Sequence, residues 1–216
     1  MNILLVAATK SEVEPLLKEF AKDPAEAGFN LGRLKVKCLI SGVGMFATTF
    51  AMAKELSNHQ YDLAINAGIA GSFDRHFTLG QVLHVTDDTF ADFGVEDGDQ
   101  FISMNDLGLA RNQYNPIDPN FKSSSLDRLL KARAITVNKV HGNEKSIAAT
   151  ASSLNPQLES MEGSAFFYAC GQFSLPSIQI RAVSNFVERR NRDQWNIPLA
   201  IEQLNQFLCT FMKDLA

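Results

Sequence analysis

Two polar side chains in the C-terminal third of the chain have the positions and chemistry of a ligand site. Glu162 falls in the first turn of an expected helix that follows Ser160, a typical N-cap residue, and runs to Cys170. Asn185 follows an expected buried strand at 178–183, which is short and rich in Ile and Val. Because ligands of open α/β sheets collect at the carboxyl ends of strands, we expect both side chains at such a site.

A third polar residue, Glu12, has two interpretations. In the run Thr9-Lys10-Ser11-Glu12, its side chain fits a capping box and accepts a hydrogen bond from the N-cap amide. A carboxylate in a ligand site also acts as a general base toward water. The residue types alone favour the capping box.

These residues belong to longer motifs. Met161-Glu162, followed about twenty residues later by Arg181-Ala182-Val183-Ser184, resembles the nucleoside phosphorylase and nucleosidase superfamily. The segment 185–198, together with 66–73 and 95–98, resembles the futalosine hydrolases of that superfamily. The resemblance covers nearly the whole chain.

The resemblance implies roles for the two carboxylates. Glu12 falls where nucleosidases carry the acid that activates water, and this interpretation then takes precedence over the capping box. Glu162 would accept hydrogen bonds from both hydroxyls of the ribose, while Met161 packs on the sugar. The alternative for Glu162 is an acid that the helix dipole favours in a first turn.

Asn185 departs from the pattern of the adenine-cleaving nucleosidases, which have an Asp that donates a proton toward the purine N7. An amide does not protonate a leaving group, but it donates hydrogen bonds to N7 or to a 6-oxo group. Asn185 therefore favours hypoxanthine or guanine nucleosides, and Val140 is assigned to the same purine site. The alternative is an amide that satisfies polar groups at a strand end.

Backbone and charged groups complete the expected site. The backbone of Gly68, Ile69, Ala70 and Gly71 would approach the ligand, although the same glycines suit a plain turn. Arg181 is expected to pair with Glu162 or Glu12. Four cations either bind an anionic 5′ substituent of the substrate or form a solvated face: Arg189, Arg190, Arg192 and Lys139.

A glycine motif after an expected strand has a competing interpretation. Gly42-Val43-Gly44 opens a helix, as a dinucleotide-binding fingerprint does. That site requires an acidic residue at the end of the next strand, but Asp62 precedes its strand and the strand ends in Asn66. The motif therefore predicts a tight strand-to-helix turn near the ligand.

Composition argues against several classes of protein. The net charge of −4 and the pI near 5.6 argue against nucleic acid or an anionic membrane as a partner. The histidines show no ligand spacing, so no metal is predicted. The three cysteines lie far apart and are typical of reduced thiols in a cytoplasmic protein. The apolar start, 1–8, lacks the basic region of a signal peptide and is too short for a membrane span.

Hydrophobic periodicity predicts strands alternating with helices, which is typical of an α/β fold with a largely parallel sheet. The expected strands are 2–8, 34–41, 63–66, 81–90, 134–140 and 178–183. The expected helices are 13–20, 46–56, 147–153, 161–170 and 198–215. Residues 108–125 are expected to form a surface excursion. The resemblance implies one nucleoside phosphorylase-like domain over 1–216, with a mixed, mostly parallel, partly barrel-like sheet flanked by helices.

The combined prediction is a nucleoside hydrolase that requires no cofactor. The resemblance implies hydrolysis of the N-glycosidic bond of futalosine to hypoxanthine and dehypoxanthinyl futalosine, in the futalosine route of menaquinone biosynthesis. The habit of the superfamily implies a homo-oligomer.

Three alternatives stay open. A methylthioadenosine or adenosylhomocysteine nucleosidase, or another purine nucleosidase, fits the fold, but adenine cleavage fits Asn185 poorly. A phosphorylase would need a phosphate pocket, usually with an Arg in the N-terminal third, where Arg33 is the one Arg before Arg75. A non-catalytic nucleoside-binding module is disfavoured by the presence of both Glu12 and Glu162.

Overall fold

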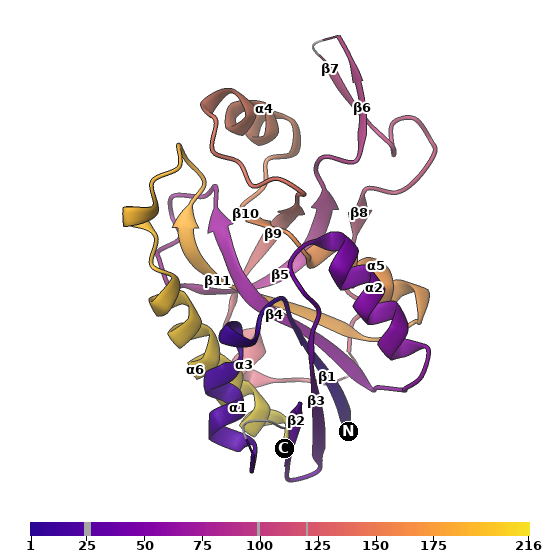
Figure 1. The fold of residues 1–216 in the computed structure, drawn as a ribbon, viewed down its shortest axis with the longest axis vertical. Helices are drawn as coiled ribbons and strands as arrows, with labels where there is room; N and C mark the ends of the chain where they lie inside the picture. The colour runs from indigo at the N-terminus through magenta and orange to yellow at the C-terminus, as the bar shows by residue number, and fades with distance from the viewer. Residues whose placement is uncertain (24–26, 99, 120) are drawn as a thin grey trace.

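A nine-stranded mixed sheet lies at the centre of the computed structural model, which describes residues 1–23, 27–98, 100–119 and 121–216. Its order is β10-β9-β5-β11-β4-β1-β3-β2, with β8 paired to β5 (Figure 1). These strands are β1 (Asn2–Ala7), β2 (Gly28–Leu31), β3 (Leu34–Ile40), β4 (Leu63–Ser72), β5 (Val82–Phe90), β8 (Gln113–Tyr114), β9 (Leu130–Thr136), β10 (Leu158–Ser160) and β11 (Ser177–Phe186). A separate hairpin of β6 (Gly94–Asp97) and β7 (Gln100–Ser103) projects from the body.

Part of this sheet closes into a barrel. β10 pairs with β9 in parallel and with the end of β4 in the antiparallel direction. Strands β4, β11, β5, β9 and β10 therefore form a ring, while β1, β3 and β2 extend from β4 as an open sheet. The predicted fold, a mixed and mostly parallel sheet with a barrel-like part and flanking helices, is confirmed.

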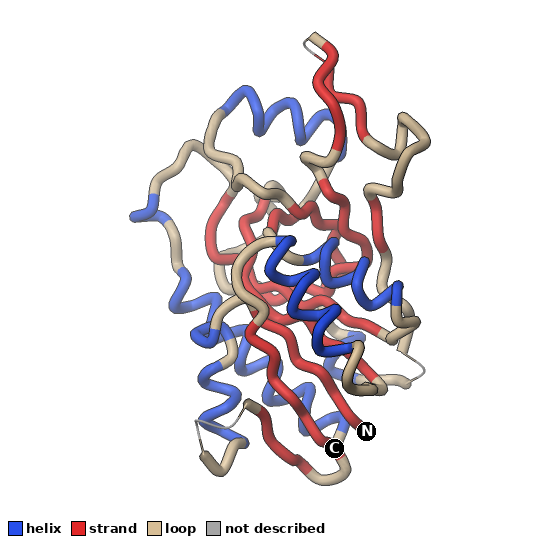
Figure 2. Tube along the Cα trace, turned by 45° about the vertical axis from the view of Figure 1, so that its right-hand side comes forward, coloured by secondary structure: helices blue, strands red, loops and turns tan. Residues whose placement is uncertain are grey.

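Helices cover both faces of the sheet (Figures 1 and 2). On one side lie α1 (Glu14–Phe20), α3 (Ser124–Asp127) and α6 (Ile197–Leu215). On the other side, α2 (Met45–Leu56) and α5 (Gly163–Gln172) pack side by side. Helix α4 (Glu144–Leu154) lies beyond the ends of β9 and β10 and has no buried residue. None of the helices described has the length and hydrophobicity that crossing a bilayer requires.

Helix α6, near the C-terminus, packs on the sheet and bonds to the turn that contains Glu12. Its apolar stripe recurs at helical spacing and is buried against the sheet: Leu204, Leu208, Phe211 and Leu215. Asn205 lies in the same stripe and donates from Nδ2 to the Glu12 carbonyl at 2.8 Å. Its Oδ1 accepts from the Leu16 amide at 3.0 Å. The helix therefore holds the short 3-10 turn η1 (Lys10–Glu12) in place.

The strand predicted at 134–140 is wrong at both ends, because β9 begins at Leu130 and ends at Thr136. The apolar Val140 suggested a longer strand, but the chain has left the sheet there. The Asn138 amide donates instead to Asp92 Oδ2 at 2.8 Å, which turns the backbone out of the ladder.

The helix predicted over 161–170 begins two residues later, at Gly163. Ser160 is the last residue of β10 rather than the N-cap, and Glu162 occupies the cap position. Ser160 Oγ still accepts from the Gly163 amide at 3.4 Å. The short β10 was missed because three residues carry too little periodicity to identify a strand.

Two other predicted strands are longer than expected. β4 continues from Asn66 through the glycine-rich 67–71 to Ser72, so this stretch is extended rather than turned. β11 continues to Phe186 and includes Asn185. The predicted excursion 108–125 contains β8 and the first two residues of α3, and its residue 120 lies outside the described residues.

Candidate active site

Glu12 is buried and bonded through both oxygens of its carboxylate. Oε2 accepts from the Thr9 amide at 2.8 Å, so the predicted capping box is present. Oε1 accepts from the Ile69 amide of β4 at 3.2 Å. The two interpretations of Glu12 are compatible, because one oxygen caps the turn while the other faces the middle of β4.

Glu162 is also buried, and its side chain does not cap its own helix. Oε1 accepts from the Gly44 amide at 3.0 Å, in the turn that precedes α2. Oε2 lies 3.9 Å from Nη2 of Arg181. A helix-dipole explanation of this acid is therefore incomplete, because the carboxylate turns away from α5 and toward a loop and a cation.

Arg181 is a buried cation on β11 beside this carboxylate. Its Nη2 donates to Asn66 Oδ1 on the neighbouring β4 and lies 3.5 Å from Gln179 Oε1. Its Nε has no hydrogen-bond partner among the described residues. The predicted pairing of Arg181 with a carboxylate is present toward Glu162, at the outer limit of an ion pair.

Asn185 follows a β-bulge in β11. The pairing with β4 shifts by one residue between Val183 and Asn185, which leaves Ser184 as the extra residue. Bulges re-aim side chains and are frequent next to active sites. Oδ1 of Asn185 accepts from Ser184 Oγ at 2.8 Å, and Nδ2 donates to the Phe186 carbonyl at 3.0 Å. The amide thus uses one N–H internally and retains a second.

The glycines of 68–71 are explained by side chains that approach β4. A Cβ at Gly68 would overlap Nη1 of Arg181 and lie 2.9 Å from Oε1 of Glu12. A Cβ at Gly71 would lie 3.2 Å from Nδ2 of Asn185. Three of the proposed functional side chains therefore converge on one strand, and the glycines make room for them.

The four predicted cations differ in their surroundings. Arg189 lines a cleft of about 450 Å³ between α4 and the end of β11. The other residues of that cleft are Arg75, Glu144, Ile147, Ala148, Val187 and Glu188. Arg190 and Arg192 lie over the Trp195 ring at 5.7 and 6.0 Å, and Lys139 is exposed in the loop after β9. Arg189 is therefore placed to meet a group bound in this cleft.

The two remaining predicted site residues lie in loops. Met161 is half-buried in the bend between β10 and Glu162, and its predicted contact with a sugar stays a prediction. Val140 is 43% exposed in the loop between β9 and α4.

The fold occurs in known proteins. The model of a family described as the phosphorylase superfamily matches residues 2–213. The chain belongs to this superfamily. A futalosine hydrolase of Streptomyces coelicolor is 28% identical over 94% of this chain and 92% of its own length. A 5′-methylthioadenosine/S-adenosylhomocysteine nucleosidase of Colwellia psychrerythraea is 26% identical, over 88% and 86%. A crystal structure of the Colwellia nucleosidase, in complex with adenine, has a TM-score of 0.81 at 18% identity and covers 100% of this chain and 96% of its own.

This member of the superfamily also has a buried polar network that sequence reasoning missed. Asp88 of β5 accepts from Thr136 Oγ1 at 2.8 Å, Ser164 Oγ at 2.7 Å and Gln179 Nε2 at 2.8 Å. Burial raises the pKa of the Asp88 carboxyl, while these three donors oppose the rise. The Gln179 side chain donates to Asp88 and accepts from Arg181, so it links this network to the buried cation. A bulge in β5 before Asp88 obscured its inward position in the sequence.

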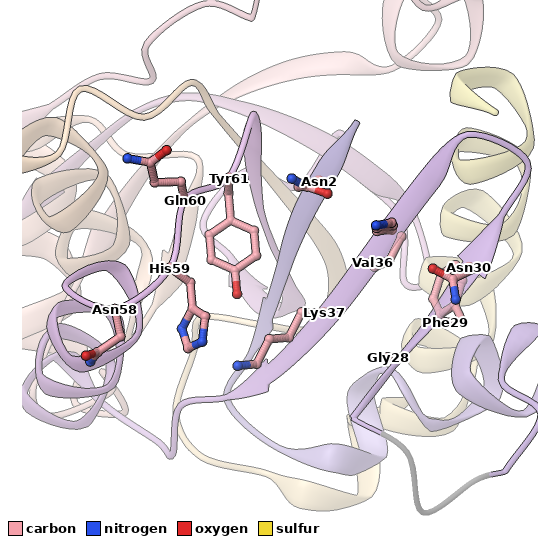
Figure 3. A pocket seen from close by; sticks show the side chains of 11 residues that line it. Asn2, Gly28, Phe29, Asn30, Val36, Lys37, Asn58, His59, Gln60 and Tyr61 are labelled. Atoms are coloured by element: carbon pink, nitrogen blue, oxygen red, sulfur yellow. The ribbon is translucent and has the colours of Figure 1, made fainter.

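A second cleft, of about 710 Å³, lies away from the superfamily motifs and is lined by none of the predicted site residues (Figure 3). Lys37, His59 and Tyr61 lie in it. All three contact Glu55, with Lys37 Nζ at 2.8 Å and His59 Nδ1 at 3.0 Å, so these polar groups are already satisfied by the protein. Within the described residues, no group of three His, Cys, Asp or Glu side chains is placed to hold a metal ion.

Proposed function

We propose that the protein hydrolyses the N-glycosidic bond of a purine nucleoside, with futalosine as the substrate. The observation that carries this proposal is the convergence of two buried carboxylates, Glu12 and Glu162, around Arg181 and Gly68. The similarity to a futalosine hydrolase and to a nucleosidase supports the same reaction class.

In the proposed reaction, each polar group has one task. Glu12 takes a proton from water, whose oxygen bonds to C1′ of the ribose as the bond from C1′ to the base breaks. Glu162 accepts hydrogen bonds from the ribose hydroxyls and offsets the positive charge that develops on the sugar. Asn185 donates to the departing base, which gains its proton from solvent or from the site. No cofactor enters this scheme.

The choice of base rests on Asn185. Its unused N–H serves an acceptor such as N7 or O6 of hypoxanthine. A second candidate function, cleavage of methylthioadenosine or adenosylhomocysteine, is supported by the nucleosidase relative at similar identity. Asn185 disfavours that function, because an amide does not supply the proton that an adenine leaving group requires.

A phosphorylase usually binds phosphate with an Arg from the N-terminal third of the chain, and Arg33 is the candidate here. The position of Arg33 favours hydrolysis over phosphorolysis. Its Nε donates to the Leu215 carbonyl at 3.4 Å, in the turn between β2 and β3. A phosphate in the active site would need cations there, and Arg181 is already engaged with Asn66 and Gln179.

The decisive experiment is a panel of futalosine, methylthioadenosine and inosine, with release of free base measured with and without phosphate. We expect release of hypoxanthine from futalosine at a rate independent of phosphate. Accumulation of a sugar 1-phosphate would contradict the hydrolase, and preferred cleavage of methylthioadenosine would replace the proposed substrate.

We also propose that Arg189 binds an anionic 5′ substituent, because a buried anion requires a partner and Arg189 lines a cleft. Arg189→Ala should raise KM for futalosine and leave KM for inosine unchanged. Arg190→Ala is the matched control, because that side chain lies over Trp195. Equal effects of the two variants on futalosine would refute this role.

A homo-oligomer is proposed for the same protein. Phe46 and Phe50 lie one turn apart on α2 and are 79% and 72% exposed, which is a large apolar surface for one helix. Light scattering of the purified protein should give a multiple of the 23.8 kDa chain. A mass of one chain would contradict the proposal.

A further inference from the structure

The glycine motif that resembles a dinucleotide fingerprint has a different task in this fold. The Gly44 amide donates to Oε1 of Glu162 at 3.0 Å, across 118 positions of the chain. Gly44 is the N-cap residue of α2, and its carbonyl accepts the first helical bond from Thr48 at 3.0 Å. Its N–H points away from that helix and toward the candidate ribose-binding carboxylate.

The conformation of Gly44, rather than crowding, requires glycine at this position. Its φ is 94° and its ψ is 162°, a region that is almost confined to glycine. A Cβ built on Gly44 meets nothing within 4 Å. Glycine is therefore required for the backbone conformation that sets the direction of the N–H group, and not for lack of space.

The turn that aims this N–H is anchored beside the other candidate carboxylate. The Ser41 and Gly42 amides bond to the carbonyls of Ala7 and Ala8 at 2.9 and 3.2 Å. Ala7 is the last residue of β1, and Ala8 leads directly to Thr9, whose amide donates to Glu12. One end of β1 thus supports both carboxylates.

We propose that the Gly44 N–H is a positioning group that orients Glu162 toward the two ribose hydroxyls, an inference that rests on the proposed nucleosidase function. A carboxylate has about four acceptor positions on its two oxygens. Gly44 occupies one position on Oε1 and stops rotation of the group. The remaining positions on Oε1 and Oε2 face the sugar, and Arg181 approaches Oε2 at 3.9 Å without closing it.

The test compares substrates with and without a ribose hydroxyl. Gly44→Ala should lower kcat/KM for inosine about tenfold more than for 2′-deoxyinosine, since it loosens a hydrogen bond to a charged group. Gly98→Ala is the control, because Gly98 also has a positive φ, 62°, and open space, but lies in the β6–β7 hairpin. An unchanged ratio of the two substrates in Gly44→Ala overturns the proposal, as does an equal change in Gly98→Ala.

A second measurement needs no activity and no stable Gly44 variant. Selective 15N-glycine labelling gives up to 13 amide signals, one of which belongs to Gly44. Glu162→Gln should shift the Gly44 signal upfield and leave Gly98 in place, because the acceptor loses its charge. A Gly44 signal that does not respond refutes the contact. If the wild-type enzyme cleaves no nucleoside while this signal responds, the proposed function fails and the contact stands.

Discussion

Nη2 of Arg181 lies 3.9 Å from Oε2 of Glu162, and both side chains are buried. The closer partners of Arg181 are amide oxygens, those of Asn66 and Gln179. The cation therefore lowers the cost of burying the acid without forming a tight pair that would occupy Oε2. This loose pair leaves Glu162 able to respond to positive charge on a bound sugar.

Glu162→Gln should therefore reduce kcat by about 10²-fold or more while changing KM little. The Gln oxygen still accepts from the Gly44 amide, so the geometry is kept, but the negative charge that offsets the transition state is lost. Steady-state kinetics on the preferred nucleoside measure both constants. Glu202→Gln, on the exposed face of α6, is the control. An unchanged kcat would remove Glu162 from the mechanism.

Glu12→Gln should lower kcat by about 10²–10⁴-fold, since an amide is not a general base. It should also lower stability by about 1 kcal/mol, because a Gln oxygen replaces two carboxylate oxygens that accept from Thr9 and Ile69. Thr9→Ala is the matched control: it removes the 3.1 Å contact from Thr9 Oγ1 to Oε2 and keeps the carboxylate. Should Thr9→Ala lose as much activity as Glu12→Gln, the capping role alone would explain Glu12.

A pH-dependent contribution to stability is expected where Asp214 of α6 bonds to the start of α3. Asp214 Oδ2 accepts from Ser123 Oγ at 2.7 Å and from the Ser125 amide and hydroxyl at 3.0 and 2.8 Å. These hydrogen bonds lower the pKa of Asp214 from 3.8 to about 2. A lowered pKa favours the ionised group in the folded state, so the contribution is present above 3.8 and is lost as the pH falls toward 2.

Asp214→Asn should therefore lower Tm at neutral pH, and its difference from the wild type should shrink as the pH falls below 3.8. Thermal unfolding followed by circular dichroism at a series of pH values measures this difference. Glu202→Gln again serves as the control, with no pH-dependent difference. A Tm difference for Asp214→Asn that stays constant across the series would show that α3 and α6 are not joined through this charge.

The sequence predicted the fold because periodicity and superfamily motifs agree over most of the chain. It predicted the capping box of Glu12 and the pairing of Arg181 with a carboxylate, but it missed other polar contacts, such as those of Gly44 and Asp88. For Gly68 and Gly71 the sequence left two interpretations open, a backbone that approaches the ligand and a plain turn. Each glycine lies inside β4, where a side chain from elsewhere approaches. Such a contact joins residues far apart in sequence, and a glycine alone does not identify its partner.

The bulges in β11 and β5 were not predicted from the sequence either. A strand's side chains alternate with a period of two, so one extra residue reverses which positions face inward. Ser184 reverses the pattern before Asn185, and a bulge between Val85 and Asp87 does the same before Asp88. Superfamily motifs located Asn185, but Asp88 had no motif and was missed.

Asn185 should set the choice of base, with one correction from the structure. One of its two N–H groups already serves the Phe186 carbonyl, so the amide offers one donor to the purine rather than two. An ionised Asp at this position has no N–H to donate. Its oxygens would face the Phe186 carbonyl and the acceptors of a 6-oxopurine without a hydrogen bond between them. Leaving such buried groups unpaired costs about 1–3 kcal/mol each, or about one to two factors of ten in rate.

Asn185→Asp should therefore lower kcat/KM on futalosine and raise the relative activity on its 6-amino analogue, because an Asp that keeps its proton donates to N7 and accepts from N6. Ser184→Ala is the matched control: it removes the 2.8 Å contact to Oδ1 of Asn185 and keeps the amide. The ratio of kcat/KM for the two substrates should move in Asn185→Asp and stay near the wild-type value in Ser184→Ala. If the ratio does not move toward the amino compound, Asn185 does not read the base, and a 6-oxopurine substrate loses its main structural support.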